Sequence, residues 1–122
     1  MKRKTRIINI NNRSYVWWYN IGNYTYLHIS PYNDKTSVIT IEFNYDDNGK
    51  SQSTEEFAEY IIMNKENTEY CIKTISPKMI ALILSYLSPD AFMPRKNTVY
   101  NGFNLLSQFR FTVCNIKPGL YW

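Results

Sequence analysis

Short apolar segments separated by asparagine-rich turns fill the first third of the chain, and this pattern restricts the fold more than any other feature. Asparagine tolerates the positive φ that a tight hairpin turn requires. The segment at 37–43 is rich in the β-branched residues that favour strands. Pro31 cannot donate a hydrogen bond to a sheet, so we expect the strand to end there or to lie at a sheet edge. The pattern predicts an antiparallel meander with strands at residues 7–10, 13–19, 24–30 and 37–43.

Two helices are predicted after the meander. Residues 76–87 begin with Ser76 as N-cap and Pro77 at the first helical position, where a missing N–H does no harm. This segment is apolar on nearly every side, which indicates deep burial. A shorter helix is predicted from Ser53, because Ser53 and Glu56 have the spacing of a capping box. Its apolar stripe would consist of Phe57, Tyr60, Ile61 and Met63.

The remaining segments complete an α+β fold. Residues 69–75 and 109–116 are predicted strands, 94–102 is a predicted basic and polar loop, and 103–108 fits a helix or a strand. At 122 residues the chain has the size of one domain. We therefore predict a single α+β domain over residues 1–122, with residues 1–6 as a basic tail. An N-terminal antiparallel β-meander of about four strands packs with a buried helix, and one shorter helix and a C-terminal strand complete it.

Charge is segregated along the chain. The net charge of +4 combines basic ends with an acidic middle, since residues 42–69 contain eight acidic side chains and two lysines. No apolar run is long enough to span a bilayer, and the basic N-terminus lacks the apolar segment of a signal peptide. We therefore expect a cytoplasmic protein that does not act in a membrane.

Cys71 and Cys114 each lie in an apolar, strand-like context, which predicts a pair of buried free thiols. A disulfide is the alternative, although it would be out of place in a reducing compartment. The chain has one histidine, His28, and no CxxC motif. We expect neither a metal site nor a cofactor.

The segment RSYVWWYNIGNYTYLHIS is the most aromatic part of the chain. A four-residue loop at 20–23 would pair Tyr19 with Tyr24, and alternation would then place two sets of side chains on opposite faces. The set with Val16, Trp18, Thr25, Leu27 and Ile29 is the better core. The candidate binding face consists of Tyr15, Trp17, Tyr19, Tyr24, Tyr26 and His28.

Two interpretations of this candidate binding face remain open. The 76–87 helix could cover it, or it could remain exposed and bind a protein or stack against nucleic-acid bases. A two-residue turn at Asn11-Asn12 would place Ile8 opposite Tyr15, and this favours a covered face.

No catalytic motif surrounds His28 or lies in the acidic middle of the sequence. A general base needs a nucleophile and an orienting group within hydrogen-bond reach, and no sequence pattern supplies them here. The stretch Asp46-Asp47-Asn48-Gly49 lacks the ligand spacing of a calcium loop. We expect a protein that is not an enzyme.

The segments RIININNRSYVWWYN and ISPKMIALILSYLSPDAFMP together resemble small uncharacterised bacterial proteins. Those proteins combine a basic N-terminus, a Tyr-x-Trp hairpin and a Ser/Thr-Pro helix that leads into a proline-containing strand. Tyr15 and Trp17 match the hairpin, and Ser76-Pro77 matches the helix start. The Gly-Trp that follows the helix in the family is absent, and Phe92 and Pro94 are its nearest equivalents. The resemblance covers about half the chain and implies a compact α+β domain without an established activity.

Together these observations predict a small cytoplasmic bacterial interaction or accessory protein, of the kind found as immunity-type modules, without catalytic activity. Its partner would be another protein or a second copy of the chain. The alternative is a nucleic-acid-binding protein that uses the aromatic face and the basic tail. The candidate phosphate contacts are Lys2, Arg3, Lys4 and Arg6.

Overall fold

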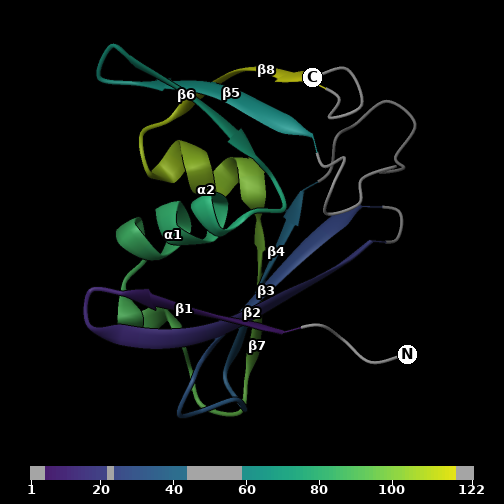
Figure 1. The fold of residues 1–122 in the computed structure, drawn as a ribbon, viewed down its shortest axis with the longest axis vertical. Coiled ribbons are helices and arrows are strands. Elements are labelled where there is room, and N and C mark those ends of the chain that lie inside the picture. The colour runs from purple at the N-terminus through teal and green to yellow at the C-terminus, as the bar shows by residue number, and fades with distance from the viewer. Residues whose placement is uncertain (1–4, 22–23, 44–58, 118–122) are drawn as a thin grey trace.

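The computed structural model describes residues 5–21, 24–43 and 59–117, and within these ranges the fold is mixed α+β. This part of the chain contains eight strands in two sheets, two α-helices and one short 3-10 turn (Figure 1). The elements are β1 (Arg6–Ile10), β2 (Arg13–Ile21), β3 (Thr25–Pro31), β4 (Val38–Phe43), β5 (Tyr60–Lys65), β6 (Thr68–Lys73), α1 (Pro77–Tyr86), η1 (Pro89–Ala91), β7 (Asn97–Asn101), α2 (Gly102–Gln108) and β8 (Thr112–Lys117).

The first sheet has five strands in the order β1-β2-β3-β4-β7. Its first four strands are antiparallel, which confirms the predicted meander. Asn11 and Asn12 have φ values of 53° and 64°, so they form the two-residue turn that brings Ile8 opposite Tyr15. The fifth strand, β7, lies parallel to β4 in the region predicted as a loop, so that prediction is wrong at residues 97–101.

The second sheet has three strands in the order β6-β5-β8. Its central strand β5 occupies residues 60–65, so the predicted short helix is wrong there, and its capping box at 53–56 lies outside the described residues. Burial follows a strand period, since Ile61 and Met63 are fully buried and Ile62 between them is half-buried. Glu66 and Asn67 form a tight turn with positive φ into β6, the strand predicted at 69–75.

Helix α1 confirms the predicted helix at 76–87. Ser76 caps it, because its Oγ accepts a hydrogen bond from the Met79 N–H at 3.2 Å. Burial is one-sided and not all-round as predicted: Met79, Ile80, Ile83 and Leu84 are buried, whereas Lys78, Ser85 and Tyr86 are exposed. Residues 103–108, for which the sequence fits a helix or a strand, lie in a helix, α2. Asn101 caps its N-terminus.

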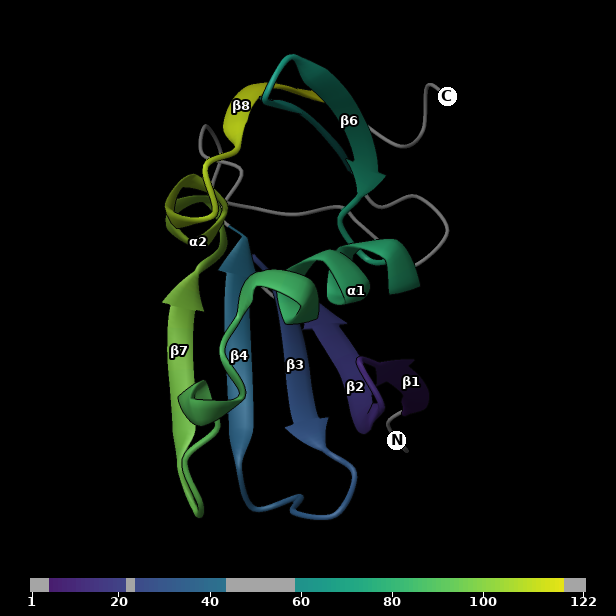
Figure 2. The same ribbon diagram turned by 90° about the vertical axis from the view of Figure 1, so that its left-hand side faces the viewer.

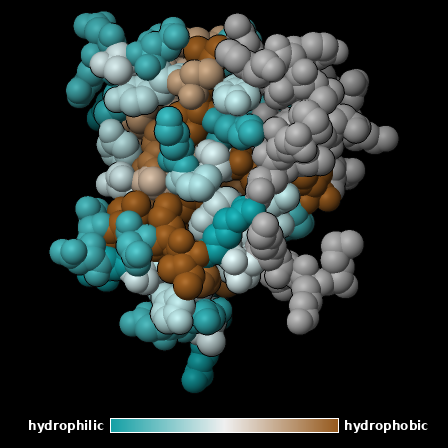
Figure 3. Space-filling model, in the orientation of Figure 1, coloured by the Kyte–Doolittle hydropathy of each residue, from teal (hydrophilic) through white to brown (hydrophobic). Residues whose placement is uncertain are grey.

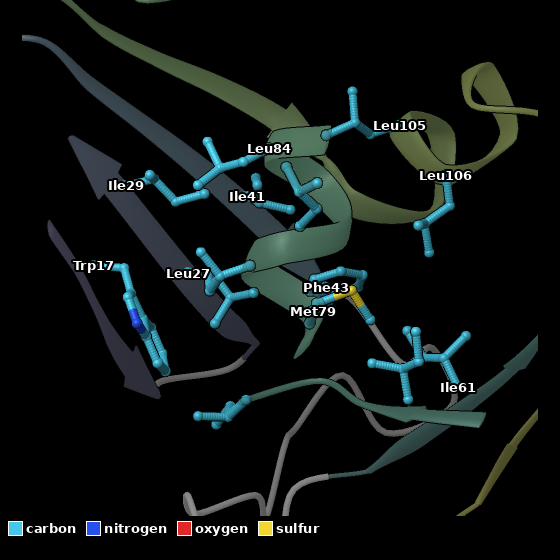
Figure 4. Close-up of a cluster of buried hydrophobic side chains, with 14 of the residues drawn as sticks. Trp17, Leu27, Ile29, Ile41, Phe43, Ile61, Met79, Leu84, Leu105 and Leu106 are labelled. Atoms are coloured by element: carbon cyan, nitrogen blue, oxygen red, sulfur yellow. The ribbon is translucent and has the colours of Figure 1, made fainter. Parts of the chain in front are cut away.

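Both helices lie between the two sheets, on the same side of the five-stranded sheet (Figures 1 and 2). One hydrophobic cluster includes Trp17 and Phe43 of the first sheet, Ile61 of the second and Met79 of α1 (Figure 4). On the face shown in Figure 3, apolar side chains gather at the level of α1 and the β1–β2 hairpin. Packing in this cluster therefore buries one stripe of α1, which consists of Met79, Ile80, Ile83 and Leu84.

Candidate functional site

The predicted candidate binding face does not form, because the register of β2 and β3 differs from the predicted one. Tyr19 pairs with Leu27, three residues beyond the expected Tyr24. The difference arises because β2 continues to Ile21 and β3 starts at Thr25. An odd offset moves one strand's side chains to the opposite face. The six aromatic and histidine side chains are therefore divided between the two faces.

Tyr15, Trp17 and Tyr19 lie on the face that packs toward the helices. Tyr15 and Trp17 are 6% and 1% exposed, and Tyr19 is half-buried against the same core. Leu27 and Ile29, which were predicted as core, are fully buried beside them. This half of the predicted set is part of the core, as the covered interpretation expected.

Tyr26 and His28 lie on the opposite face of the five-stranded sheet, which we call the outer face. Trp18, predicted as core, lies there too and stacks on His28 with ring centroids 5.3 Å apart. Tyr24 precedes β3 and contacts the Tyr26 ring edge-on at 6.5 Å. None of the described helices covers the outer face (Figure 2). Its two most exposed apolar side chains are Ile7 at 62% and Val99 at 61%.

A chain of polar side chains crosses four strands of the outer face. His28 Nδ1 lies 2.9 Å from Thr40 Oγ1, and Thr40 donates to Asn97 Oδ1 at 2.9 Å. His28 Nε2 lies within hydrogen-bond distance of Asn20 Oδ1. Both ring nitrogens are therefore engaged in bracing the strands to one another.

Of the predicted phosphate contacts, Arg6 is the one that the structure describes. Its guanidinium lies 5.3 Å from the centroid of the Trp17 ring, at the β1 edge of the sheet. Lys2, Arg3 and Lys4 lie outside the described residues. A role in phosphate binding stays a prediction for all four.

A cavity of about 350 Å³ lies at the end of the sheet where β2 begins and β3 ends. Tyr15 and Phe92 form its aromatic wall, with ring centroids 5.5 Å apart. Its lining consists of Asn12, Arg13, Ser14, Tyr15, Pro31, Tyr32, Asn33, Pro89 and Phe92. The aromatic wall attaches the segment that follows α1 to the meander.

A larger groove of about 730 Å³ lies between β6 and α1, and we call it the β6 groove. Strand β6 contributes one wall as an edge of the second sheet, and α1 contributes the other. Small or half-exposed side chains of α1 face it, among them Ala81, Leu82 and Ser85. The full lining is Glu69, Tyr70, Cys71, Ile72, Lys78, Ala81, Leu82, Ser85, Tyr86 and Phe111.

Within the described ranges no strand pairs with the outer edge of β6, and this edge presents backbone hydrogen-bonding groups at alternate residues. Thr74 N–H donates to the Glu59 carbonyl at 2.8 Å, so this opposed pair is a hydrogen-bonded one. Such pairs alternate along an antiparallel ladder. Counting along the register of β5 and β6, residues 69, 71 and 73 have their N–H and C=O groups directed away from β5. These groups are in the position to pair with an added strand.

Strand β6 carries one acidic and one basic side chain on the same face. Glu69 and Lys73 lie with Cys71 on the face of the second sheet that points away from the helices. Within the described ranges, neither Glu69 nor Lys73 makes a salt bridge; the Lys73 ammonium lies 5.9 Å from the Tyr60 ring.

Desolvation by burial raises the pKa of the Glu59 carboxyl above its ordinary value, and a backbone hydrogen bond partly offsets this shift.

Lys65 contacts two aromatic residues that line the β6 groove, Tyr86 and Phe111. Its ammonium donates to the Phe109 carbonyl at 2.6 Å and lies 4.9 Å from the Tyr86 ring and 5.3 Å from the Phe111 ring. Tyr86 and Phe111 themselves meet edge-on at 5.6 Å. These contacts hold the aromatic end of the groove in place.

The prediction that both cysteines are buried is wrong, since Cys71 and Cys114 are exposed free thiols. Alternation along β6 explains the first, because Tyr70 and Ile72 face the core and Cys71 therefore faces away. Cys114 lies on β8, where its Sγ accepts from Asn64 Nδ2 at 3.2 Å. Among the residues that the structure describes, no three metal-ligating side chains lie together.

The strand at β6 was predictable from the sequence, but its position at a sheet edge and the groove beside it were not. The alternation of Glu69, Cys71 and Lys73 with Tyr70 and Ile72 indicates a strand with one polar face.

Neither described helix is long and apolar enough to cross a membrane. Comparison with protein-family models, curated proteins and solved structures finds no match to this chain.

Proposed function

We propose that this chain is a non-catalytic interaction protein that binds an extended segment of another polypeptide by adding it as a strand to β6. One observation carries the proposal: among the described residues β6 has a partner strand on one side only, and its other edge borders the β6 groove. In strand addition, main-chain hydrogen bonds supply affinity and a neighbouring groove receives alternate side chains. The outward-directed N–H and C=O groups of residues 69, 71 and 73 supply the main-chain hydrogen bonds. The groove between β6 and α1 receives the alternate side chains.

The proposal includes the cytoplasm as the place where the protein acts. Cys71 and Cys114 are both free and exposed. Exposed thiols persist in a reducing compartment and are oxidised outside it. An accessory role in a bacterial cytoplasm is compatible with these thiols.

Two contacts weigh against nucleic-acid binding, the alternative function. The Arg6 guanidinium is held against Trp17, and one face of the Trp18 ring is covered by His28. A base-stacking platform needs an aromatic face that a base can reach. The acidic character of residues 42–69 also opposes a polyanion.

Substitution of Cys71 by proline tests strand addition. Proline removes the outward-directed N–H at this position and leaves the ladder with β5 intact, since edge strands accept proline on their free side. Random linear peptides displayed on phage are selected against the wild-type chain. We expect the selected peptides to bind wild type and Cys71→Ser, to lose binding to Cys71→Pro, and to slow hydrogen exchange at the amides of residues 69, 71 and 73.

A second variant, Ala81→Phe, fills the β6 groove from α1 without touching β6, and it should weaken the same peptides. Far-UV circular dichroism checks that both variants fold. The proposal is overturned if no peptide is enriched, or if the enriched peptides bind Cys71→Pro and Ala81→Phe as well as wild type.

A further inference from the structure

Strand β6 is chemically self-complementary, and we infer that a second copy of the chain adds its own β6 to this edge in antiparallel orientation. The inference rests on the proposed function and names the partner. It yields a two-fold symmetric dimer in which the three-stranded sheets of two copies join into one six-stranded sheet.

Backbone geometry restricts the register. Only residues 69, 71 and 73 direct hydrogen-bonding groups outward, and they must oppose the outward-directed residues of the second copy. The two-fold axis can therefore pass through any one residue from 69 to 73. It cannot pass between two residues, because that would oppose an outward-directed residue with an inward-directed one.

Charge selects one of these registers. With the axis at Cys71, Glu69 of each copy lies opposite Lys73 of the other. The same register places Tyr70 opposite Ile72 on the inner side of the sheet. Opposite charges and aromatic–β-branched pairs are the favourable cross-strand combinations. An axis at Glu69 or Lys73 would oppose like charges, and an axis at Tyr70 or Ile72 would leave the charges unmatched.

The β6 groove has the shape that this pairing needs. Ala81 and Ser85 are one turn apart on α1 and have small side chains, so the helix of the second copy can approach closely beneath the paired strands. Leu82 is half-exposed in the isolated chain and would be covered. The Tyr70–Ile72 pairs would then extend the existing core across the two-fold axis.

The opposite edge of the second sheet is less suited to pairing. The ladder of β5 with β8 is interrupted by a register shift at Ile62/Met63. A bulge of this kind disrupts a regular edge and makes strand addition unfavourable. Strand β6, in contrast, pairs with β5 without interruption from Thr68 to Lys73.

Charge reversal tests the register. Analytical ultracentrifugation gives the dimer dissociation constant, which we expect in the micromolar range because β6 has six residues and the interface is small. Glu69→Lys alone and Lys73→Glu alone each place like charges opposite one another twice per dimer. We expect each to raise the dissociation constant about tenfold or more. The double variant Glu69→Lys/Lys73→Glu restores both pairs and should return the constant to within about threefold of wild type.

Glu66→Lys is the matched control for Glu69→Lys. It changes the net charge equally, but Glu66 lies in the turn, where it faces no residue of the second copy in this register. Its dissociation constant should stay close to that of wild type. If the double variant dimerises no better than the single ones, or if Glu66→Lys weakens the dimer as much as Glu69→Lys, the register is overturned.

Thiol crosslinking gives a second readout. In a hydrogen-bonded antiparallel pair the two Cys71 Cα atoms lie about 5.5 Å apart. A short bismaleimide, which alkylates one thiol at each end, should then crosslink Cys114→Ser, which keeps Cys71, into a dimer. It should leave Cys71→Ser, which keeps the exposed Cys114, monomeric. Equal crosslinking of the two variants, or of neither, contradicts the proposed axis.

The outcomes separate the two proposals. A wild-type chain that stays monomeric into the millimolar range overturns the dimer. If selected peptides still bind it and lose binding to Cys71→Pro, strand addition at β6 stands with a different partner. If neither self-association nor Cys71→Pro-sensitive peptide binding is observed, both proposals fail.

Discussion

Adjacent tryptophans in β2 occupy opposite faces of the five-stranded sheet. Trp17 is 1% exposed and lies in the hydrophobic cluster (Figure 4). The Arg6 guanidinium lies over its ring. Trp18 stacks on His28 on the outer face and is half-buried. The β2–β3 loop determines this assignment. Strand β2 ends two residues later and β3 starts one residue later than predicted, so the pairing shifts by three residues and its parity is reversed.

The pair provides a matched test of the register. We expect Trp17→Ala to lower the free energy of unfolding by about 3–5 kcal/mol, as for other large-to-small core substitutions. Trp18→Ala should lower it by about 1 kcal/mol, because it removes a half-buried stacking contact. Urea denaturation followed by far-UV circular dichroism measures both values. If Trp18→Ala costs as much as Trp17→Ala, the observed register is contradicted.

Elements with strong local signals were predictable from the sequence. The meander follows from its asparagine turns, and α1 follows from Ser76-Pro77. The prediction of a helix at β5 is wrong because the spacing of Phe57, Tyr60 and Ile61 fits a helix, whereas Ile61 and Met63 fit the two-residue period of the observed strand.

The remaining elements depend on contacts between segments that are distant in the sequence. Strand β7 forms through its parallel pairing with β4. A parallel pair is not joined by a tight turn, so no local sequence pattern indicates this pairing. The position of β6 at an edge likewise depends on β8 pairing with the other side of β5. The candidate site could therefore be predicted as a strand, but not as an edge beside a groove.

The start of α2 gives a prediction at the element scale. A Cβ added to Gly102 would lie 2.5 Å from Cε1 of Phe43, whose fully buried ring contacts Phe103 edge-on. Since the ring cannot leave the core without cost, Gly102→Ala should lower the free energy of unfolding by about 1–3 kcal/mol. Urea denaturation measures the loss.

Phe43→Leu in the Gly102→Ala background supplies the control. The smaller side chain makes room for the new methyl group, so the double variant should lose less stability than the sum of the two single losses. Strictly additive losses would mean that the contact between Phe43 and Gly102 does not limit packing there.

At the scale of the whole molecule, the two sheets share one hydrophobic cluster. Ile41 of β4 and Ile61 of β5 are both fully buried in it, and the helices lie between the strands that carry them (Figures 1 and 4). Both sheets contribute buried side chains to this cluster. This arrangement predicts that the sheets unfold together, as expected for a single domain.

Truncation in either sheet tests this coupling. Ile61→Ala and Ile41→Ala should each lower the free energy of unfolding by about 2–5 kcal/mol. In a Trp122→Phe background, fluorescence reports on Trp17 and Trp18 in the first sheet, while far-UV circular dichroism reports on all elements. We expect both probes to give the same urea midpoint for each variant, with an unchanged slope.

If the two sheets unfold in one transition, a cavity created beside β5 also lowers the urea midpoint measured by the fluorescence of the tryptophans in β2. If Ile61→Ala shifts the circular dichroism transition and leaves the fluorescence midpoint unchanged, the second sheet unfolds by itself. Strand β6 and its groove would then belong to a separately melting unit. Coincident midpoints would instead tie the stability of the β6 edge to the core beneath α1, so that binding at this edge stabilises the whole chain.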